Sequence, residues 1–273
     1  MAALTFDAGP TGPPAARFLG LLDSPPPLPA YPWAAFRREW GPIFYRGRLD
    51  GTARVLVIGQ DPGQHECIGR RILVGAAGQR VQGFLAKLGI TRSYTMVNAF
   101  LFCCYTKKAA VDFRNDPSLA PDRDAWIAAV LETSPVEVVV AFGTAAREAY
   151  EGYLDRRTGG LGRPDPVLVP VMHPTAPFAE TTVLTNWNTG LAAAFPALTA
   201  RDVAVSLVPY GTAFTPGDFA PIPSIDLPAG TPAWMGGVDM WAWREAAAAT
   251  PTTPAIPKRA RVAVAVPVTA RGW

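Results

Sequence analysis

Side chains of the kinds that enzymes use in catalysis occur where apolar runs of the sequence end. A carboxamide and a carboxylate follow one run, a second carboxamide lies near the end of another, and an imidazole follows a third: Gln60 and Asp61 come after RVLVIG (54–59), Asn98 lies in YTMVNAF (94–100), and His173 lies near the end of PVLVPVMHP (166–174). In a parallel sheet, ligands bind in the crevice outside the carboxyl ends of the strands. The sequence therefore predicts that these side chains converge on one site.

Each of these residues also has a purely structural alternative. Asp61, within GQDPG, can cap a helix in a turn. Asn98 can satisfy backbone groups in a bend, and His173 can be a hydrogen-bonded core residue. Because the structural alternatives would have to hold for all three at the same predicted sheet edge, we favour a common site.

The apolar runs alternate with segments of helical periodicity. The runs expected to be buried strands are 54–59, 94–100, 136–143 and 166–174. Helices are expected at 78–89, 121–134, 144–154 and 185–195, with a lead-in helix at 29–41. Strands that alternate with helices form parallel sheets covered on both faces. The predicted fold class is α/β, a three-layer α/β/α arrangement with a central, mainly parallel four-stranded sheet.

The character of the sequence changes near residue 200. Residues 1–200 are expected to form a single α/β domain. Residues 201–250 are rich in Pro, Gly and Trp, and hold too many aromatic residues for a free tail, so they are expected to pack on that domain. Residues 251–273 are expected to form a flexible tail.

Composition indicates a globular protein with a large core. Hydrophobic residues make up 49% of the 273 residues and charged residues 17%. No apolar run approaches the roughly 20 residues that a membrane helix needs, and the first residues lack the basic and apolar regions of a signal peptide. We therefore expect a cytoplasmic protein, nucleoid-associated if bacterial, with no membrane partner.

The cysteines do not have the spacing of a metal or cluster site. Cys67, Cys103 and Cys104 are an odd number, and the adjacent pair lacks the CxxC pattern of zinc and iron–sulfur sites. They are expected to be reduced thiols in or near the core, in a protein without metal or cofactor.

Positive charge is concentrated in one part of the sequence. Residues 37–108 carry twelve Lys or Arg against four Asp or Glu, a local charge of +8, whereas residues 109–200 carry six against eleven, a local charge of −5. This asymmetry predicts one face that suits a polyanion. The alternative is that the charges are spread around a solvated surface.

Three motifs carry a resemblance to a known family. GQDPG, VNAF and MHPTAP, in that order and each behind an apolar run, resemble the motifs of the uracil-DNA glycosylase superfamily. The resemblance covers roughly residues 54–178 and, by fold, about 30–198. It implies a monofunctional DNA glycosylase, a monomer that hydrolyses the N-glycosidic bond of uracil in single- or double-stranded DNA for base excision repair.

The resemblance implies a role for each motif residue. Asp61, fixed by Pro62, would lie below the sugar, hold a water and offset the positive charge that develops there. His173, as a neutral imidazole, would donate to uracil O2 beside backbone N–H groups near Gln60. Asn98 would bind O4 and N3–H, atoms that present the opposite donor and acceptor pattern in cytosine.

Action on a duplex requires the nucleotide to be flipped out of the stack. The residues that the resemblance places on the DNA are Pro62, Gly63, Pro174, Thr175, Pro177 and Phe178. Phe178 is the expected apolar wedge, with an ordinary core position as its alternative. The basic segment 37–108 would bind phosphates.

Two positions depart from the family pattern. Members commonly have an aromatic residue that stacks on the flipped base, but residues 62–83 contain no Phe, Tyr or Trp. Leu73 or Val74 occupies the aligned place, so an aliphatic face such as Leu73, or the guanidinium of Arg71, is expected to contact the base. Gly63 replaces a Tyr that excludes the methyl group of thymine in the best-known branch.

These departures leave two alternatives open. One is a glycosylase for another deaminated or mismatched base. The other is a slow binder of abasic or damaged DNA that retains its product.

Overall fold

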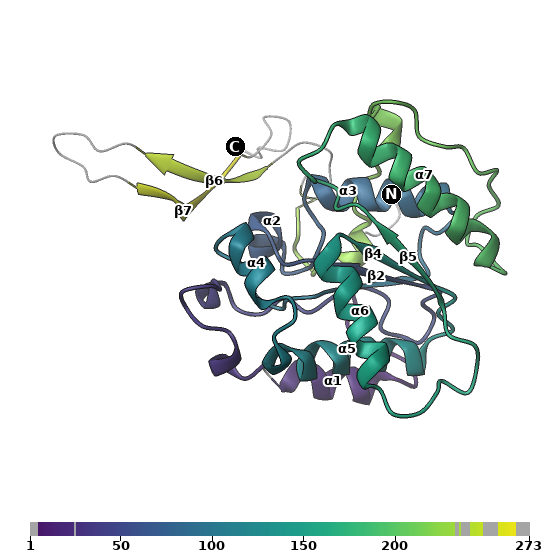
Figure 1. Ribbon diagram of the computed structural model, residues 1–273, viewed down its shortest axis with the longest axis horizontal. Coiled ribbons are helices and arrows are strands. Elements are labelled where there is room, and N and C mark those ends of the chain that lie inside the picture. Colours follow the sequence, from purple (N-terminus) through teal and green to yellow (C-terminus); the bar gives the residue numbers. More distant parts are fainter. Residues whose placement is uncertain (1–4, 25, 233–234, 236–240, 248–255, 266–273) are drawn as a thin grey trace.

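A five-stranded sheet forms the centre of the protein in a computed structural model that describes residues 5–24, 26–232, 235, 241–247 and 256–265 (Figure 1). The strands are β1 (Arg46–Gly47), β2 (Val55–Gly59), β3 (Tyr94–Asn98), β4 (Val138–Phe142) and β5 (Val167–Val171). Their order is β1-β3-β2-β4-β5, with β1 antiparallel to β3 and every other pair parallel. The predicted α/β class with a mainly parallel sheet is confirmed. The sheet has five strands instead of four because β1, at two residues, is too short to be recognised as an apolar run.

Helices cover both faces of the sheet, as expected for a three-layer fold. The α-helices are α1 (Ala15–Asp23), α2 (Gln64–Gly69), α3 (Ala76–Lys87), α4 (Lys107–Phe113), α5 (Ala120–Thr133), α6 (Thr144–Arg156) and α7 (Glu180–Ala197). Short 3₁₀ turns are η1 (Leu28–Ala30), η2 (Arg38–Trp40), η3 (Pro117–Leu119), η4 (Pro216–Asp218) and η5 (Ser224–Asp226). Helices α1, α5 and α6 pack on one face, and α3 and α7 pack on the other (Figure 1).

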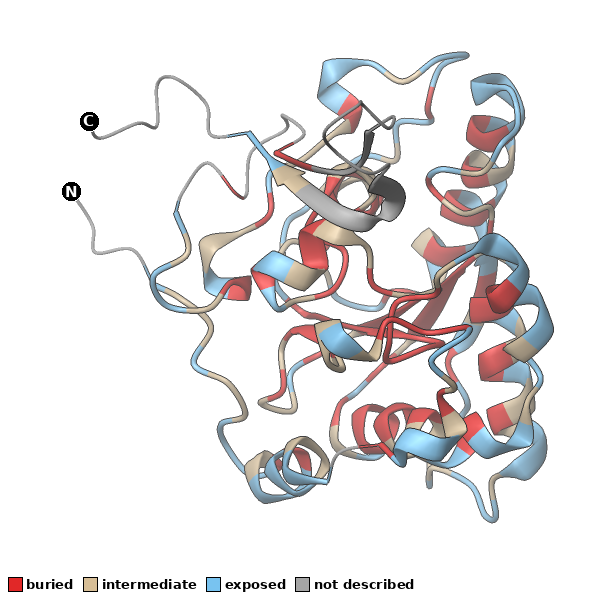
Figure 2. Cartoon of the chain, turned by 90° about the vertical axis from the view of Figure 1, so that its left-hand side faces the viewer, coloured by how far each residue is buried: buried red, intermediate tan, exposed pale blue. Residues whose placement is uncertain are grey.

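Alternate residues of each central strand enter different hydrophobic clusters. In β2, Leu56 and Ile58 belong to the cluster under α5 and α6, whereas Val55 and Val57 belong to the cluster under α3 and α7. Strands β2, β3 and β4 are buried along their whole length (Figure 2). Burial on both faces explains why these strands read as continuous apolar runs in the sequence.

The predicted lead-in helix at 29–41 is wrong. In place of a helix the segment has the short turns η1 and η2, and its backbone pairs with the loop after β3. Arg37 N–H donates to Cys103 O at 2.8 Å, and Tyr105 N–H donates to Ala35 O at 2.8 Å. Backbone pairing with a distant loop replaces the local hydrogen bonds that a helix would make.

The chain after α7 returns across the domain and is tied to the sheet by a buried carboxylate. Asp226 is 1% exposed and forms ion pairs with Arg46, at 3.2 Å, and with Arg48. Tyr94 also donates its hydroxyl to Asp226. The segment around residue 226 is therefore fixed to β1 and β3.

A second, two-stranded sheet follows. Strands β6 (Ala242–Ala247) and β7 (Ile256–Val264) pair antiparallel and project from the body beside α2 (Figure 1). Strand β7 lies in the stretch for which the sequence predicted a flexible tail. The remainder of that stretch, 251–255 and 266–273, lies outside the described residues apart from residue 265. Within the described part of the chain, no helix is long and apolar enough to cross a bilayer.

Candidate active site

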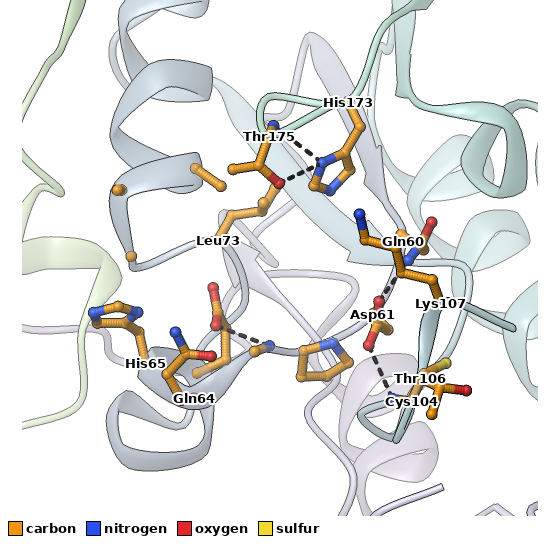
Figure 3. Close-up of a pocket in the computed structure, with 16 residues that line it drawn as sticks. Gln60, Asp61, Gln64, His65, Leu73, Cys104, Thr106, Lys107, His173 and Thr175 are labelled. Carbon is orange, nitrogen blue, oxygen red and sulfur yellow. Dashed lines mark hydrogen bonds between the residues drawn. The ribbon is translucent and has the colours of Figure 1, made fainter. Parts of the chain in front are cut away.

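A cavity of about 340 Å³ lies at the carboxyl edge of the sheet, within the size range of small-molecule sites. It is bordered by the loops after β2 and β5 and by the first turns of α2, α3 and α4 (Figure 3). Seven of the residues predicted from sequence line it: Gln60, Asp61, Pro62, Gly63, Leu73, His173 and Thr175. The expected convergence at this edge therefore holds for the loops after β2 and β5.

Two donors fix the carboxylate of Asp61. Gln60 Nε2 donates to Oδ1 at 2.9 Å, and the backbone N–H of Cys104 donates to Oδ2 at 2.9 Å (Figure 3). Cys104 is itself held by an antiparallel bridge to Phe36. An ionised carboxylate offers about four lone-pair sites and no donor, which suits Asp61 to hold a water or to face a positive charge.

Glu66 clamps the loop that carries Asp61. Its Oε2 accepts from Gly63 N–H at 2.9 Å and its Oε1 accepts from Val74 N–H at 3.1 Å. Burial raises the pKa of Glu66, while the hydrogen bonds from backbone N–H groups act to lower it. A side chain at position 63 would place its Cβ 2.9 Å from Glu66 Oε2. Glycine at this position therefore leaves room for the clamp.

The imidazole of His173 is held in one orientation. Its Nδ1 accepts from Thr175 N–H at 3.2 Å and lies 3.1 Å from Thr175 Oγ1. Burial, with a smaller contribution from the charge of Lys107, lowers the pKa of His173 to about 4. The ring is therefore neutral near pH 7. Because Nδ1 accepts a backbone N–H, the proton lies on Nε2, which can donate into the cavity.

The turn that carries His173 is anchored from both sides. Trp187 Nε1 donates to Met172 O at 2.9 Å, and Arg80 donates to Pro174 O at 2.6 Å. Beyond the turn, the side chain of Phe178 is 60% exposed, so the core alternative for this residue is wrong. Pro177 and Phe178 border a second cavity of about 480 Å³ that shares Gln60, Lys107, His173 and Thr175 with the first.

Asn98 lies at the same sheet edge but does not line the cavity. It ends β3, is 3% exposed, and faces Gly59 of β2 so closely that a Cβ at position 59 would collide with its Oδ1. Leu73, which does line the cavity, has its Cδ1 3.6 Å from the same point. Leu73 adopts a left-handed backbone conformation with φ of +52°. The glycine at 59 thus makes room for Asn98, and Asn98 lies beside the cavity-lining Leu73 without lining the cavity itself.

Arg71 is not brought into the site. Its guanidinium pairs with Asp7 at 2.7 Å and lies over the ring of Tyr45 at 4.6 Å. Val74 is 1% exposed and packs in a small cluster with Trp241. Of the candidates for contact with a base in this part of the chain, Leu73 alone borders the cavity.

Six of the twelve basic residues in segment 37–108 are paired with acids from outside that segment. The pairs are Arg46 and Arg48 with Asp226, Arg54 with Glu137, Arg71 with Asp7, Lys87 with Asp218, and Lys108 with Asp112. These pairs, all but Lys108–Asp112 between residues far apart in sequence, neutralise part of the charge that the sequence count left positive. The local charge of +8 therefore does not produce a basic face of that size.

A comparison with protein families gives a match to the uracil DNA glycosylase superfamily over residues 46–190. The chain belongs to this superfamily. It is therefore a DNA glycosylase of a kind that acts in base excision repair. No curated protein matches the chain. The matched range of the superfamily contains the motif residues from Gln60 to Phe178 and all seven residues predicted in the cavity.

Sequence reasoning missed two groups in the cavity of this glycosylase. One is the backbone N–H of Cys104, which fixes Asp61, and the other is Lys107, which borders both cavities. Lys107 carried a usable signal, because it follows the loop that leaves the predicted strand 94–100 at its carboxyl end. The contact from Cys104 carried none, since it depends on how that loop folds back.

Proposed function

We propose that the protein is a monofunctional uracil-DNA glycosylase. The observation that carries the proposal is that the carboxylate of Asp61 and the neutral imidazole of His173 border one cavity in a member of this superfamily. Cleavage of the N-glycosidic bond of deoxyuridine leaves positive charge on the sugar and negative charge on the base. A site with an acceptor-only group and a neutral donor can stabilise both charges.

In this mechanism Asp61 acts on the sugar. The carboxylate, held by Gln60 and the Cys104 N–H, holds the attacking water and offsets the charge of the oxocarbenium-like sugar. The group is already oriented before substrate binds, so little reorganisation is needed as charge develops.

His173 acts on the leaving base. With its proton on Nε2, the neutral ring donates a hydrogen bond to O2 of uracil as negative charge accumulates there. Lys107 borders the same cavity, and its positive charge also favours an anionic base. The base can therefore leave as an anion without prior protonation.

Base selection is proposed to involve Asn98 and Leu73. Leu73 lies in the cavity wall, and Asn98 lies next to it against Gly59. For Asn98 to bind O4 and N3–H of uracil, the side chain of Leu73 has to move aside when the base enters. Asn98→Asp should lower uracil release and allow weak cytosine release, because the carboxylate accepts from the cytosine amine. A folded variant with full uracil activity would show that Asn98 does not contact the base.

The loop after β5 is proposed to contact the DNA. Pro174, Thr175, Pro177 and Phe178 follow His173, and the exposed Phe178 suits an apolar wedge that replaces the flipped nucleotide. Pro62 and Gly63 border the cavity at the opposite loop and are proposed to lie near the DNA backbone.

Thymine in a mismatch is a second candidate substrate. Gly63 borders the cavity, and it has no side chain that could exclude the 5-methyl group. A slow binder that retains abasic DNA is less well supported, because such a protein has no need for the fixed carboxylate of Asp61.

The decisive experiment is a panel of labelled oligonucleotides that each contain one test base. Uracil opposite G, uracil opposite A, uracil in a single strand, thymine opposite G, and hypoxanthine are incubated with purified protein, heated with alkali and resolved by size. Cleavage at uracil above all other bases is the expected result. Cleavage at thymine or hypoxanthine alone would assign the protein to a different substrate, and absence of cleavage on every member would contradict a glycosylase of this kind.

A further inference from the structure

The ribbon formed by β6 and β7 is joined at its base to the wall of the cavity. The backbone N–H of Ala242, the first residue of β6, donates to His65 Nε2 at 3.1 Å. The ring of Trp241 meets the His65 ring edge-on, with centroids 4.6 Å apart, and its Nε1 donates to Met235 O at 3.1 Å. His65 borders the cavity and belongs to α2, the helix that directly follows GQDPG.

His65 forms this joint as a neutral ring. Burial lowers its pKa to about 4, so near pH 7 its Nε2 is free of a proton and can accept from Ala242. Trp241 and Ala242 are 1% and 0% exposed. The joint is therefore a buried contact in which a donor meets an acceptor, and it fixes the point at which the ribbon leaves the domain.

From this joint the ribbon extends away from the domain (Figure 1). Strand β7 has nine residues, which at about 3.3 Å per residue corresponds to roughly 30 Å. The ribbon leaves beside α2, on the side of the molecule where α4 also lies (Figure 1), and α2 directly follows the loop after β2. A partner that occupies the cavity mouth is thus within reach of the ribbon.

The two strands are rich in basic residues. Arg244 lies on β6, and Lys258, Arg259 and Arg261 lie on β7, against the single acidic residue Glu245. Four basic residues against one acidic residue give the ribbon a charge of +3. The segment expected from sequence to bind phosphates has six of its twelve basic residues in ion pairs with acids from outside it. The ribbon, which begins at the cavity wall, therefore adds a further group of basic residues in this part of the chain.

We propose that the β6–β7 ribbon is a DNA-binding arm that contacts backbone phosphates of the strand flanking the nucleotide in the cavity. The proposal rests on the proposed function in that the partner is the DNA substrate. A two-stranded ribbon has dimensions that DNA accommodates along its backbone and in its major groove. The joint at His65 fixes the origin of the arm relative to Asp61, so phosphate contacts on the arm would help to set the register of the DNA over the cavity.

The test is DNA affinity as a function of salt for a matched pair of triple variants. Lys258→Ala/Arg259→Ala/Arg261→Ala removes three charges from the arm. Arg17→Ala/Arg92→Ala/Arg156→Ala removes three exposed charges far from the cavity: α1 carries Arg17, Arg92 precedes β3, and Arg156 ends α6. Fluorescence anisotropy with an undamaged duplex and with a duplex that contains an abasic analogue gives the dissociation constant between 50 and 200 mM salt.

Each phosphate contact contributes about 0.9 to the slope of log affinity against log salt. Loss of three contacts should lower the slope by about 2.7, so between 50 and 200 mM salt the wild type should lose about 40-fold more affinity than the arm variant. The control variant should keep the wild-type slope. Circular dichroism and urea unfolding check that both variants fold. If the triple variant does not fold, the single change Arg261→Ala replaces it, with an expected slope change of about 0.9.

An arm variant with the same slope and affinity as the control variant would overturn the proposal, as would a loss of slope of equal size in both. The measurement requires no base release. A wild-type protein that binds DNA through the arm but releases no uracil would contradict the proposed function and support the arm. A wild-type protein that releases uracil, combined with equal salt slopes for the arm variant and the control variant, would support the proposed function and contradict the arm.

Discussion

Asp61→Asn is expected to remove the negative charge of the cavity and to keep the fold around it. In the wild type, Oδ1 accepts from the side chain of Gln60 and Oδ2 accepts from the backbone of Cys104. Asparagine has one oxygen and one amide nitrogen in the same places. The backbone donor cannot turn, so the asparagine oxygen should face Cys104. The amide of Gln60 can turn and offer its own oxygen to the new nitrogen, so both contacts survive as neutral hydrogen bonds.

The expected cost in stability is therefore small. Hydrogen bonds to charged groups contribute about 1.5–3 kcal/mol and neutral ones about 0.5–1.5 kcal/mol, so the change should lower the free energy of unfolding by about 1–2 kcal/mol. The loss of the negative charge beneath the sugar is larger. Removal of one preorganised electrostatic group costs about 10²- to 10³-fold in rate, or roughly 3–4 kcal/mol of transition-state stabilisation.

The assay is single-turnover release of uracil with protein in excess over a labelled oligonucleotide, accompanied by urea unfolding and by anisotropy with an abasic duplex. Asp112→Asn is the matched control, since Asp112 lies on α4 in an exposed ion pair with Lys108. It should retain the wild-type rate. A folded Asp61→Asn protein that binds DNA and releases uracil at the wild-type rate would refute the role given to this carboxylate.

Three further outcomes follow from the packing around the site. Gly59→Ala should lower the free energy of unfolding by about 1–3 kcal/mol and slow uracil release, because the new Cβ meets Asn98 Oδ1; Gly20→Ala, which meets nothing within 4 Å on α1, should be neutral or stabilising by up to about 1 kcal/mol in the same urea unfolding assay. Phe178→Ala should slow release from duplex DNA by a larger factor than release from a single strand, since only the duplex requires a wedge; equal effects on both substrates in a side-by-side time course would argue against that role. The folded-state pKa of His65, about 4, lies below the unfolded value near 6.5, so between these pH values the unfolded chain binds more protons than the folded one. The free energy of unfolding should therefore fall as the pH falls through this window, by up to about 3 kcal/mol from this residue. His65→Gln should flatten the dependence over this window in urea unfolding at pH 7, 5.5 and 4.5, and an unchanged slope would show that the ring is not buried as a neutral group.

The sequence was sufficient for features that depend on local pattern. The strands β2, β3 and β4 are buried on both faces, so their residues form uninterrupted apolar runs. The carboxyl ends of such strands must meet, which is why Asp61 and His173 could be placed in one site before any coordinates were known. The α5 helix was equally clear from its proline and acidic first turn.

Features that depend on distant partners could not be predicted in this way. Residues 29–41 have a helix-like pattern but pair with the loop after β3. Part of the charge of segment 37–108 is neutralised by acids far along the chain, such as Asp226 and Glu137. Arg71 was predicted to contact the base, but its guanidinium is bound by Asp7, 64 residues earlier in the sequence. In each case a contact between residues far apart in sequence overrides the local signal.

The buried carboxylate of Asp226 has a consequence for attempts to prepare a minimal catalytic domain. The family match ends at residue 190, and a truncation just after α7 would keep every residue of the cavity wall that lies in the matched range. It would also leave the guanidinium of Arg46, a fully buried residue of β1, without its counter-ion Asp226. Loss of one partner from a buried pair typically costs about 3–5 kcal/mol, a large part of the stability of an ordinary domain. Expression boundaries for this protein should therefore be drawn beyond residue 226, although the family match ends at residue 190.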